Sequence, residues 1–94
     1  MKYNYGQVVK IKPLAATGRH DDACPYAVLL DDGAETTGGD ERYKAVFVND
    51  LDQPTTVGLA NLYASEIEEL LPEANPQPAF AAYRALWQEV KSER

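Results

Sequence analysis

The most informative hydrophobic pattern in the chain lies within residues 43–51. Successive side chains of an extended strand point to opposite faces, so alternate positions can be compared separately. Ala45 and Phe47 place apolar groups on one face near the middle of this run. Val46 and Val48 place apolar groups on the other face. This pattern predicts a central strand that is covered on both faces and on which the other strands assemble.

Four shorter stretches have the β-branched or alternating composition that is typical of strands. Glycine, proline and aspartate residues that favour turns separate them. The predicted strands are residues 7–12, 26–30, 55–60 and 65–70. Within the third of these, Gly58 predicts a bulge or a close approach of another backbone.

The last of these stretches has two interpretations. As a short closing strand, it directs Ile67 inward and Glu66 and Glu68 outward. As a helical turn, it uses Ser65 and Glu68 in the capping-box pattern. We favour the strand, and we expect a short 3₁₀ turn just before it, at residues 61–63.

The C-terminal part of the sequence predicts a linker followed by a helix. Three prolines between residues 72 and 78 stiffen the chain and exclude a sheet interior. Asn75 followed by Pro76 is typical of a helix start, because a side-chain cap precedes a proline in the first helical position. The helix is expected to run from residue 79 to residue 91.

One face of this predicted helix is apolar and aromatic. It consists of Phe80, Tyr83, Leu86, Trp87 and Val90. Full burial of such aromatic groups contributes about 2–3 kcal/mol each, so the face should be covered. It covers either the open side of its own sheet or the surface of a second copy or partner. In the second case Phe80, Tyr83 and Trp87 form the helix interface.

Together these elements predict one mainly β domain, a small SH3-like five-stranded antiparallel barrel with one C-terminal α-helix. Residues 1–71 form the barrel, residues 72–78 form the proline-rich linker, and residues 79–94 form the helix packed on the barrel. Residues 31–42 are expected to be a mobile distal loop between the second and third strands.

The charge balance narrows the class of partner. The net charge of −6 disfavours nucleic acids and anionic membranes, because phosphate groups are bound by clustered Lys and Arg. It favours either a positively charged protein partner or a charge that simply keeps the protein in solution. No apolar run is long enough to span a membrane, no signal peptide is visible, and the single cysteine excludes an internal disulfide. We therefore expect a cytoplasmic monomer or homodimer.

The candidate binding residues are mostly acidic. Five carboxylates in the predicted distal loop form either a solvated charged loop or a docking surface for a basic partner. Asp50 and Asp52 would share one face of an extended chain, where they bind a cation, bind Arg or Lys, or shape the turn before Pro54. The residues expected to contact the partner are Asp40, Glu41, Tyr43, Asp50 and Asp52.

Tyrosine is also frequent, with six residues in the chain. Tyr3 and Tyr5 share one face of an extended N-terminus and would neighbour Tyr63 if the barrel closed. An aromatic patch surrounded by carboxylates would bind Arg or Lys. The alternative is that these rings are half-buried parts of the barrel.

Catalytic chemistry has little support in the sequence. A small metal-dependent enzyme would have to use His20, Asp21, Asp22 and Cys24. Their spacing matches no zinc pattern, and no cluster of cations lowers the pKa of Cys24 to make it a nucleophile. No glycine-rich phosphate loop is present. The sequence predicts a protein that is not an enzyme, with no cofactor and no metal.

Two family resemblances add to this interpretation. The run Gly-Leu-Ala-Asn-Leu-Tyr at residues 58–63 is similar to the end of eukaryotic SH3 domains. Over residues 3–70 the chain resembles the immunity protein 31 group, most clearly in Tyr-Gly-Gln-Val-Val-Lys-Ile at 5–11 and Tyr-Lys-Ala-Val-Phe-Val-Asn-Asp-Leu-Asp at 43–52. It departs at residues 56–59, where that group has Trp-Ser-Leu-Pro. The second resemblance implies a small SH3-like bacterial protein that neutralises a polymorphic toxin.

The expected function is therefore non-enzymatic: an acidic module, of the immunity or antitoxin type, that occludes a basic protein partner. The alternative is a structural or assembly module that dimerises through the C-terminal helix.

Overall fold

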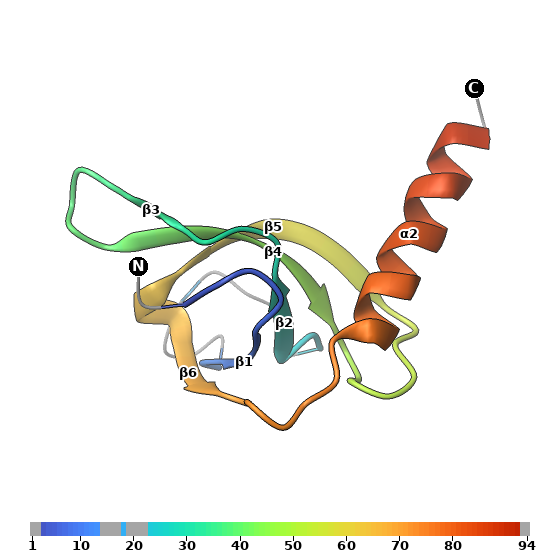
Figure 1. The fold of residues 1–94 in the computed structure, drawn as a ribbon, viewed down its shortest axis with the longest axis horizontal. Coiled ribbons are helices and arrows are strands. Elements are labelled where there is room, and N and C mark those ends of the chain that lie inside the picture. Colours follow the sequence, from blue (N-terminus) through green and yellow to red (C-terminus); the bar gives the residue numbers. More distant parts are fainter. Residues whose placement is uncertain (1–2, 14–17, 19–22, 93–94) are drawn as a thin grey trace.

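The computed structural model describes residues 3–13, 18 and 23–92, and it shows one curled antiparallel sheet with a helix at one end (Figure 1). The strands are β1 (Val8–Ile11), β2 (Tyr26–Leu29), β3 (Ala34–Glu35), β4 (Glu41–Val48), β5 (Val57–Tyr63) and β6 (Ile67–Leu70). The 3₁₀ helix η1 (Ala64–Glu66) separates β5 from β6, and the α-helix α2 spans Gln77–Ser92. The mainly β class with a C-terminal α-helix is confirmed.

Strand β4 is the centre of the sheet, as its hydrophobic pattern predicts. One of its edges pairs with β5, from Arg42 opposite Tyr63 to Val48 opposite Val57. Its other edge pairs with β2 towards the C-terminal end of β4 and with β3 at the N-terminal end. Strand β2 continues to β1, and β1 continues to β6.

The predicted five-stranded closed barrel is wrong in two respects. The sheet has six strands, because two residues of the predicted distal loop form β3. The sheet is also open, because β5 and β6 pair only with β4 and β1 within the described residues. The chain turns at η1, so β6 returns to β1 and does not continue beside β5 (Figure 1).

Both faces of the sheet carry a hydrophobic cluster. The inner cluster, on the concave face, is Val9, Ile11, Ala27, Leu29, Tyr43, Ala45, Phe47, Leu62 and Ile67. The outer cluster is Val8, Val28, Val46, Val48 and Ala79, with half-buried side chains packed against it. The side chains of β4 alternate between the two clusters, which confirms that this strand is covered on both faces.

The segment predicted as a loop is a short hairpin, which we call the distal hairpin (residues 34–42). Ala34 pairs with Arg42 and Glu35 with Glu41. The Thr36 amide donates to the Asp40 carbonyl oxygen at 3.0 Å, and the Thr36 hydroxyl donates to the same oxygen at 2.7 Å. These bonds close the tip of the hairpin, so the predicted loop is wrong over these residues.

The strand before η1 is longer and more regular than the sequence predicts. Gly58 pairs with Phe47 in an unbroken register, so the predicted bulge is wrong. Strand β5 continues to Tyr63, through the residues predicted as a 3₁₀ turn, and η1 follows it. Between residues 65 and 70, the end of η1 precedes the short strand β6, so the favoured strand is present from Ile67. The predicted capping box of Ser65 with Glu68 is wrong, because the box at η1 is formed by Tyr63 and Glu66.

Glu66 is a further correction, because its side chain is buried and not directed outward. Its Oε1 accepts a hydrogen bond from the Tyr63 amide at 2.9 Å. A carboxylate that caps a backbone amide is stabilised by that bond when it is removed from water. Ile67 is buried and Glu68 is exposed, as predicted.

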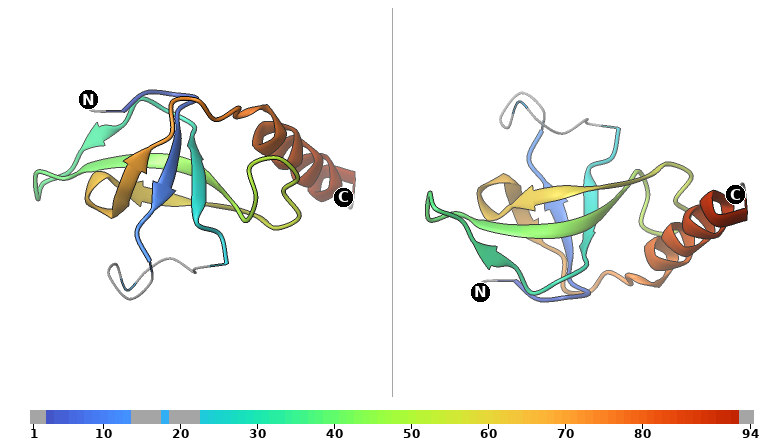
Figure 2. Two further views of the ribbon diagram at one scale, coloured as in Figure 1. Left: turned by 90° about the horizontal axis from the view of Figure 1, so that it is seen from below. Right: turned by 90° about the horizontal axis from the view of Figure 1, so that it is seen from above.

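Helix α2 begins at Gln77, two residues before the predicted start. The Asn75 side-chain oxygen accepts a hydrogen bond from the Gln77 amide at 3.1 Å, which confirms the predicted cap. Ala79 is buried in the outer cluster, and Phe80 and Tyr83 pack against it. The second half of the helix extends away from the sheet, and Leu86 is 40% exposed (Figure 1). Figure 2 shows α2 and the distal hairpin at opposite ends of the molecule.

Candidate functional site

The five residues predicted to contact a partner do not form one surface. Asp40 and Glu41 lie at the N-terminal end of β4, whereas Asp50 and Asp52 follow its C-terminal end. An eight-residue strand separates the two pairs by about 25 Å. The structure therefore divides the predicted site into two acidic positions.

Tyr43 is fully buried in the inner cluster, which corrects its prediction as a contact residue. Its ring packs edge-on against Tyr3 at a centroid distance of 5.8 Å. Its hydroxyl accepts the Tyr3 amide at 3.1 Å and donates to Glu41 Oε2 at 3.3 Å. Burial raises the pKa of the Tyr43 hydroxyl, and the nearby Glu41 carboxylate raises it further. Tyr43 is therefore a buried residue that holds Tyr3 and Glu41 in place, and it is not a contact residue.

Asp50 shapes the turn that follows β4. Its Oδ1 accepts hydrogen bonds from the Asp52 amide at 2.8 Å and the Gln53 amide at 3.2 Å. These two bonds lower the pKa of the Asp50 carboxyl, because they stabilise its ionised form. Of the two interpretations of this acidic pair, the geometry supports the turn-shaping one.

Asp40 joins the distal hairpin to η1. Its Oδ2 accepts the Ser65 hydroxyl at 2.6 Å, and its Oδ1 accepts the Glu41 amide at 3.0 Å. The hydroxyl bond from Ser65 is the main reason why the pKa of the Asp40 carboxyl is lowered. Asp40 is therefore an ionised carboxylate held in a fixed position.

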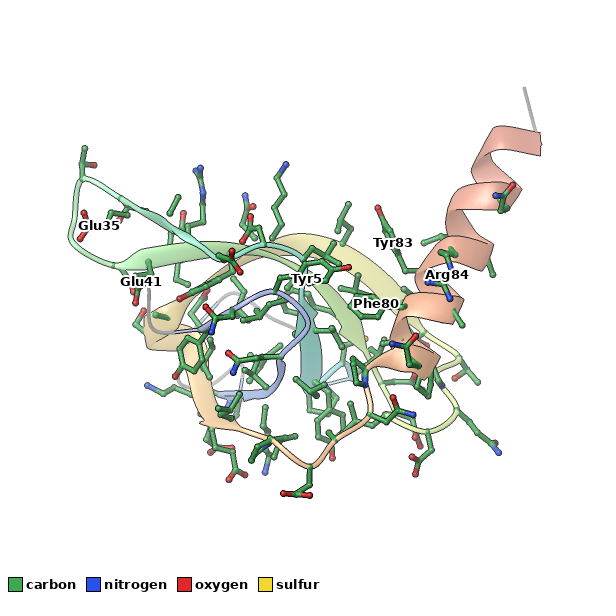
Figure 3. All side chains as sticks on the ribbon, viewed as in Figure 1. Tyr5, Glu35, Glu41, Phe80, Tyr83 and Arg84 are labelled. Atoms are coloured by element: carbon green, nitrogen blue, oxygen red, sulfur yellow. The ribbon has the colours of Figure 1, made fainter. Side chains whose placement is uncertain are left out.

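Glu35 completes this end of the molecule. It lies directly opposite Glu41 in the β3–β4 register, so the two side chains share one face. Figure 3 shows both side chains at the hairpin end of the sheet. We call Glu35, Asp40 and Glu41 the acidic hairpin end. The sequence indicates three nearby carboxylates, but the alignment of Glu35 with Glu41 depends on a turn that its pattern did not predict.

A second candidate surface lies at the N-terminal half of α2. A groove of about 360 Å³ is lined by Tyr5, Leu30, Gln77, Phe80, Tyr83 and Arg84, and we call it the helix groove. The Tyr5 ring stacks on Phe80 at a centroid distance of 5.9 Å and an interplanar angle of 16° (Figure 3). Tyr3 and Tyr5 thus pack on different partners, and their predicted common patch is wrong.

The predicted helix interface is divided in a similar way. Phe80 and Tyr83 are half-buried against the outer cluster of their own chain. The Trp87 side chain lies outside the described part of the structure. A second groove, of about 500 Å³, lies on another side of the helix between Leu86 and the start of β5, with Pro54 and Thr56 among its lining residues.

The residues proposed for metal chemistry are only partly visible. His20, Asp21 and Asp22 lie outside the described residues, and Cys24 is half-buried beside a cavity of about 200 Å³ between the ends of β1 and β2. Among residues 3–13, 18 and 23–92, no three His, Cys, Asp or Glu side chains are grouped to hold a metal. The metal-dependent alternative stays a prediction.

Within the same residues, no helix has the length and apolar character needed to cross a membrane. Comparisons with protein-family models, characterised proteins and solved structures find no match to this chain. The resemblance to the immunity protein 31 group therefore rests on the sequence motifs quoted above, and the function has to be argued from the surfaces themselves.

Proposed function

We propose that the protein is a non-enzymatic binding module whose acidic hairpin end binds a basic segment of another protein. The observation that carries this proposal is the placement of Glu35 directly opposite Glu41. Like charges that face each other across a strand pair are destabilising, and a bound cation relieves the repulsion. The bond from Ser65 keeps Asp40 ionised beside this pair.

We also propose that the sheet is an open variant of the SH3-like fold. The first strand lies between the second and the last, and a 3₁₀ turn separates the last two strands. This order is the one expected of an SH3-like domain, and here it supports assignment to an open, SH3-like variant. The resemblance to immunity proteins and the net charge of −6 support a partner that is a basic bacterial toxin.

The test compares two pairs of substitutions that change the net charge equally. Glu35→Gln with Glu41→Gln removes the facing carboxylates, and Glu69→Gln with Glu73→Gln removes two exposed carboxylates elsewhere. The probe is a fluorescent Lys- and Arg-rich peptide, followed by anisotropy at low and high salt. We expect the first pair to weaken binding about tenfold and the second pair about twofold or less. Equal losses for the two pairs would contradict the proposal.

A stability measurement separates binding from a structural role. Glu35→Gln should raise the free energy of unfolding by about 0.2–1 kcal/mol, because it removes the repulsion from Glu41. A surface that is kept for binding gains stability when its charge is removed. A loss of stability would show that Glu35 supports the hairpin.

An assembly module that dimerises through α2 is the second candidate. Leu86 is 40% exposed on the part of the helix that extends from the sheet, and it borders the groove beside β5. Exposed apolar residues beside a groove are typical of interfaces between copies. Light scattering at high concentration tests this candidate. Leu86→Glu should convert the dimer to a monomer. Gln88→Glu changes the net charge equally and should leave the dimer intact. A monomer in the unsubstituted protein would exclude it.

A further inference from the structure

The helix groove holds an aromatic side chain that is both exposed and fixed. Tyr5 is 60% exposed, although its ring stacks on Phe80. Large exposed aromatic groups that cover a groove are frequent at the centres of binding surfaces. The position of Tyr5 is therefore informative about what the groove binds.

The backbone on each side of this ring is held in place. The Tyr5 amide donates to Asp32 Oδ1 at 2.8 Å, and the Gly6 amide donates to the Leu29 carbonyl oxygen at 2.8 Å. These bonds tie the N-terminal segment to the end of β2. An aromatic side chain that is already ordered loses little conformational entropy on binding, so the groove is preorganised.

The one charged side chain among the described residues that line the groove is a cation. Arg84 lines the groove and is exposed. The helix positions three and four residues from it carry no acidic side chain. The one ion pair between described side chains joins Lys10 to Glu68, at 3.4 Å. The guanidinium group of Arg84 is therefore available to a ligand carboxylate.

A second cation lies on the same face. The Leu30 amide donates to the Lys44 carbonyl oxygen at 2.7 Å, which continues the register in which Val28 faces Val46. The Lys44 side chain is thus beside that of Leu30 on the outer face, and it is exposed. The carboxylate of Asp32 also lies here, where it is engaged by the Tyr5 amide. The groove is therefore lined by Arg84, and Lys44 lies farther along the same face, where the Asp31 carboxylate accepts its backbone amide at 3.4 Å.

We propose that the helix groove binds an acidic segment of a partner protein through an aromatic anchor. The anchor side chain enters the groove between Tyr5 and Tyr83, and flanking carboxylates pair with Arg84 and Lys44. A volume of about 360 Å³ is sufficient for such a side chain. This site is separate from the acidic hairpin end and does not depend on the function proposed there.

The test uses the full chain and a fluorescent peptide in which a tryptophan is flanked by Glu and Asp. Control peptides replace the acidic residues with Gly and Ser, or with Lys and Arg. Arg84→Glu should weaken binding of the acidic peptide about tenfold or more. Lys12→Glu is the matched control, since Lys12 is exposed away from the groove and the change in net charge is identical. Its effect should be about twofold or less.

Tyr5→Ala tests the aromatic part of the site, and its high exposure keeps the fold intact. It should weaken binding of the acidic peptide and leave binding of the Lys- and Arg-rich peptide unchanged. Equal binding of all three peptides, or equal losses from Arg84→Glu and Lys12→Glu, would overturn the proposal. A dimer that Tyr5→Ala dissolves and the acidic peptide does not displace would also overturn it, because the occupant would then be a second copy.

Discussion

The acidic hairpin end and the helix groove are separate surfaces of one molecule, and they are built in different ways (Figure 3). The carboxylates of the hairpin end come from seven consecutive positions, and backbone pairing fixes where they point. The groove is formed where the N-terminal segment, the end of β2 and α2 meet, and side-chain stacking fixes its shape. A chain with a net charge of −6 therefore has one surface of three carboxylates and a second surface that is mainly aromatic and carries the cation Arg84.

The largest expected effect concerns the turn that leads into the distal hairpin. Gly33 has φ +88°, and a Cβ at this position would lie 2.5 Å from Tyr43 Cε1. Gly33→Ala should therefore destabilise the protein by about 3 kcal/mol, through backbone strain and overlap with a buried ring. Gly39 has a similar φ of +84° with open space around it, so Gly39→Ala should cost only about 1 kcal/mol.

Urea denaturation of the two alanine variants measures this difference. A larger loss for Gly33→Ala would show that the stability of the hairpin end depends on contact with the inner cluster, and not on turn geometry alone. Similar losses for the two variants would show that Tyr43 does not restrict this turn.

A smaller effect is expected at the other end of the sheet. Phe80 is half-buried between Tyr5 and the outer cluster, so Phe80→Ala should cost about 2 kcal/mol. Leu86→Ala, on the exposed part of the same helix, should cost about 0.5 kcal/mol or less. Amide chemical shifts of the distal hairpin should stay unchanged in both variants. Changes there would show that the two surfaces are coupled.

The smallest effect is a pH dependence at the hairpin end. The pKa of Asp40 is lowered in the folded protein, mainly by the bond from the Ser65 hydroxyl. Its stabilising contribution is therefore complete above the ordinary value of 3.8 and is lost as the pH falls through the lowered folded value. Ser65→Ala should make this acid-dependent loss of stability smaller. The difference should be less than about 1 kcal/mol, because the carboxylate is near solvent.

Thermal unfolding of the unsubstituted protein and Ser65→Ala between pH 2 and pH 6 provides this comparison. The two curves should differ most at the upper end of the range and converge at the lower end. Curves that diverge as the pH falls would contradict the assignment.

The sequence was most informative where a pattern is local. Alternation along β4 predicts its burial on both faces, and Asn75 predicts the cap of α2, because each depends on neighbouring residues. Whether the sheet closes into a barrel could not be predicted in this way, because it depends on the direction that η1 gives to the chain. The burial of Glu66 has the same origin, because its bond to Tyr63 forms only in that turn.

The candidate surfaces also combine features that are apparent in the local sequence with features that only the folded structure shows. Asp40 and Glu41 are apparent as an acidic pair in the sequence, but the facing position of Glu35 needs the strand register. No local pattern connects Tyr5 with Phe80, which are 75 residues apart and meet only when both ends of the chain pack on the sheet. Tyr43 was misassigned although it alternates in phase with Ala45 and Phe47, a pattern that places its side chain on the same inner face.

The proposed function requires that a basic partner binds at the acidic hairpin end. The most direct measurement follows amide chemical shifts of the isotope-labelled protein during titration with a Lys- and Arg-rich peptide. We predict that the largest shifts occur at Glu35, Asp40 and Glu41, with little change at Glu69 or Glu73. Shifts spread evenly over the exposed carboxylates, or largest around Asp50 and Asp52, would contradict the claim.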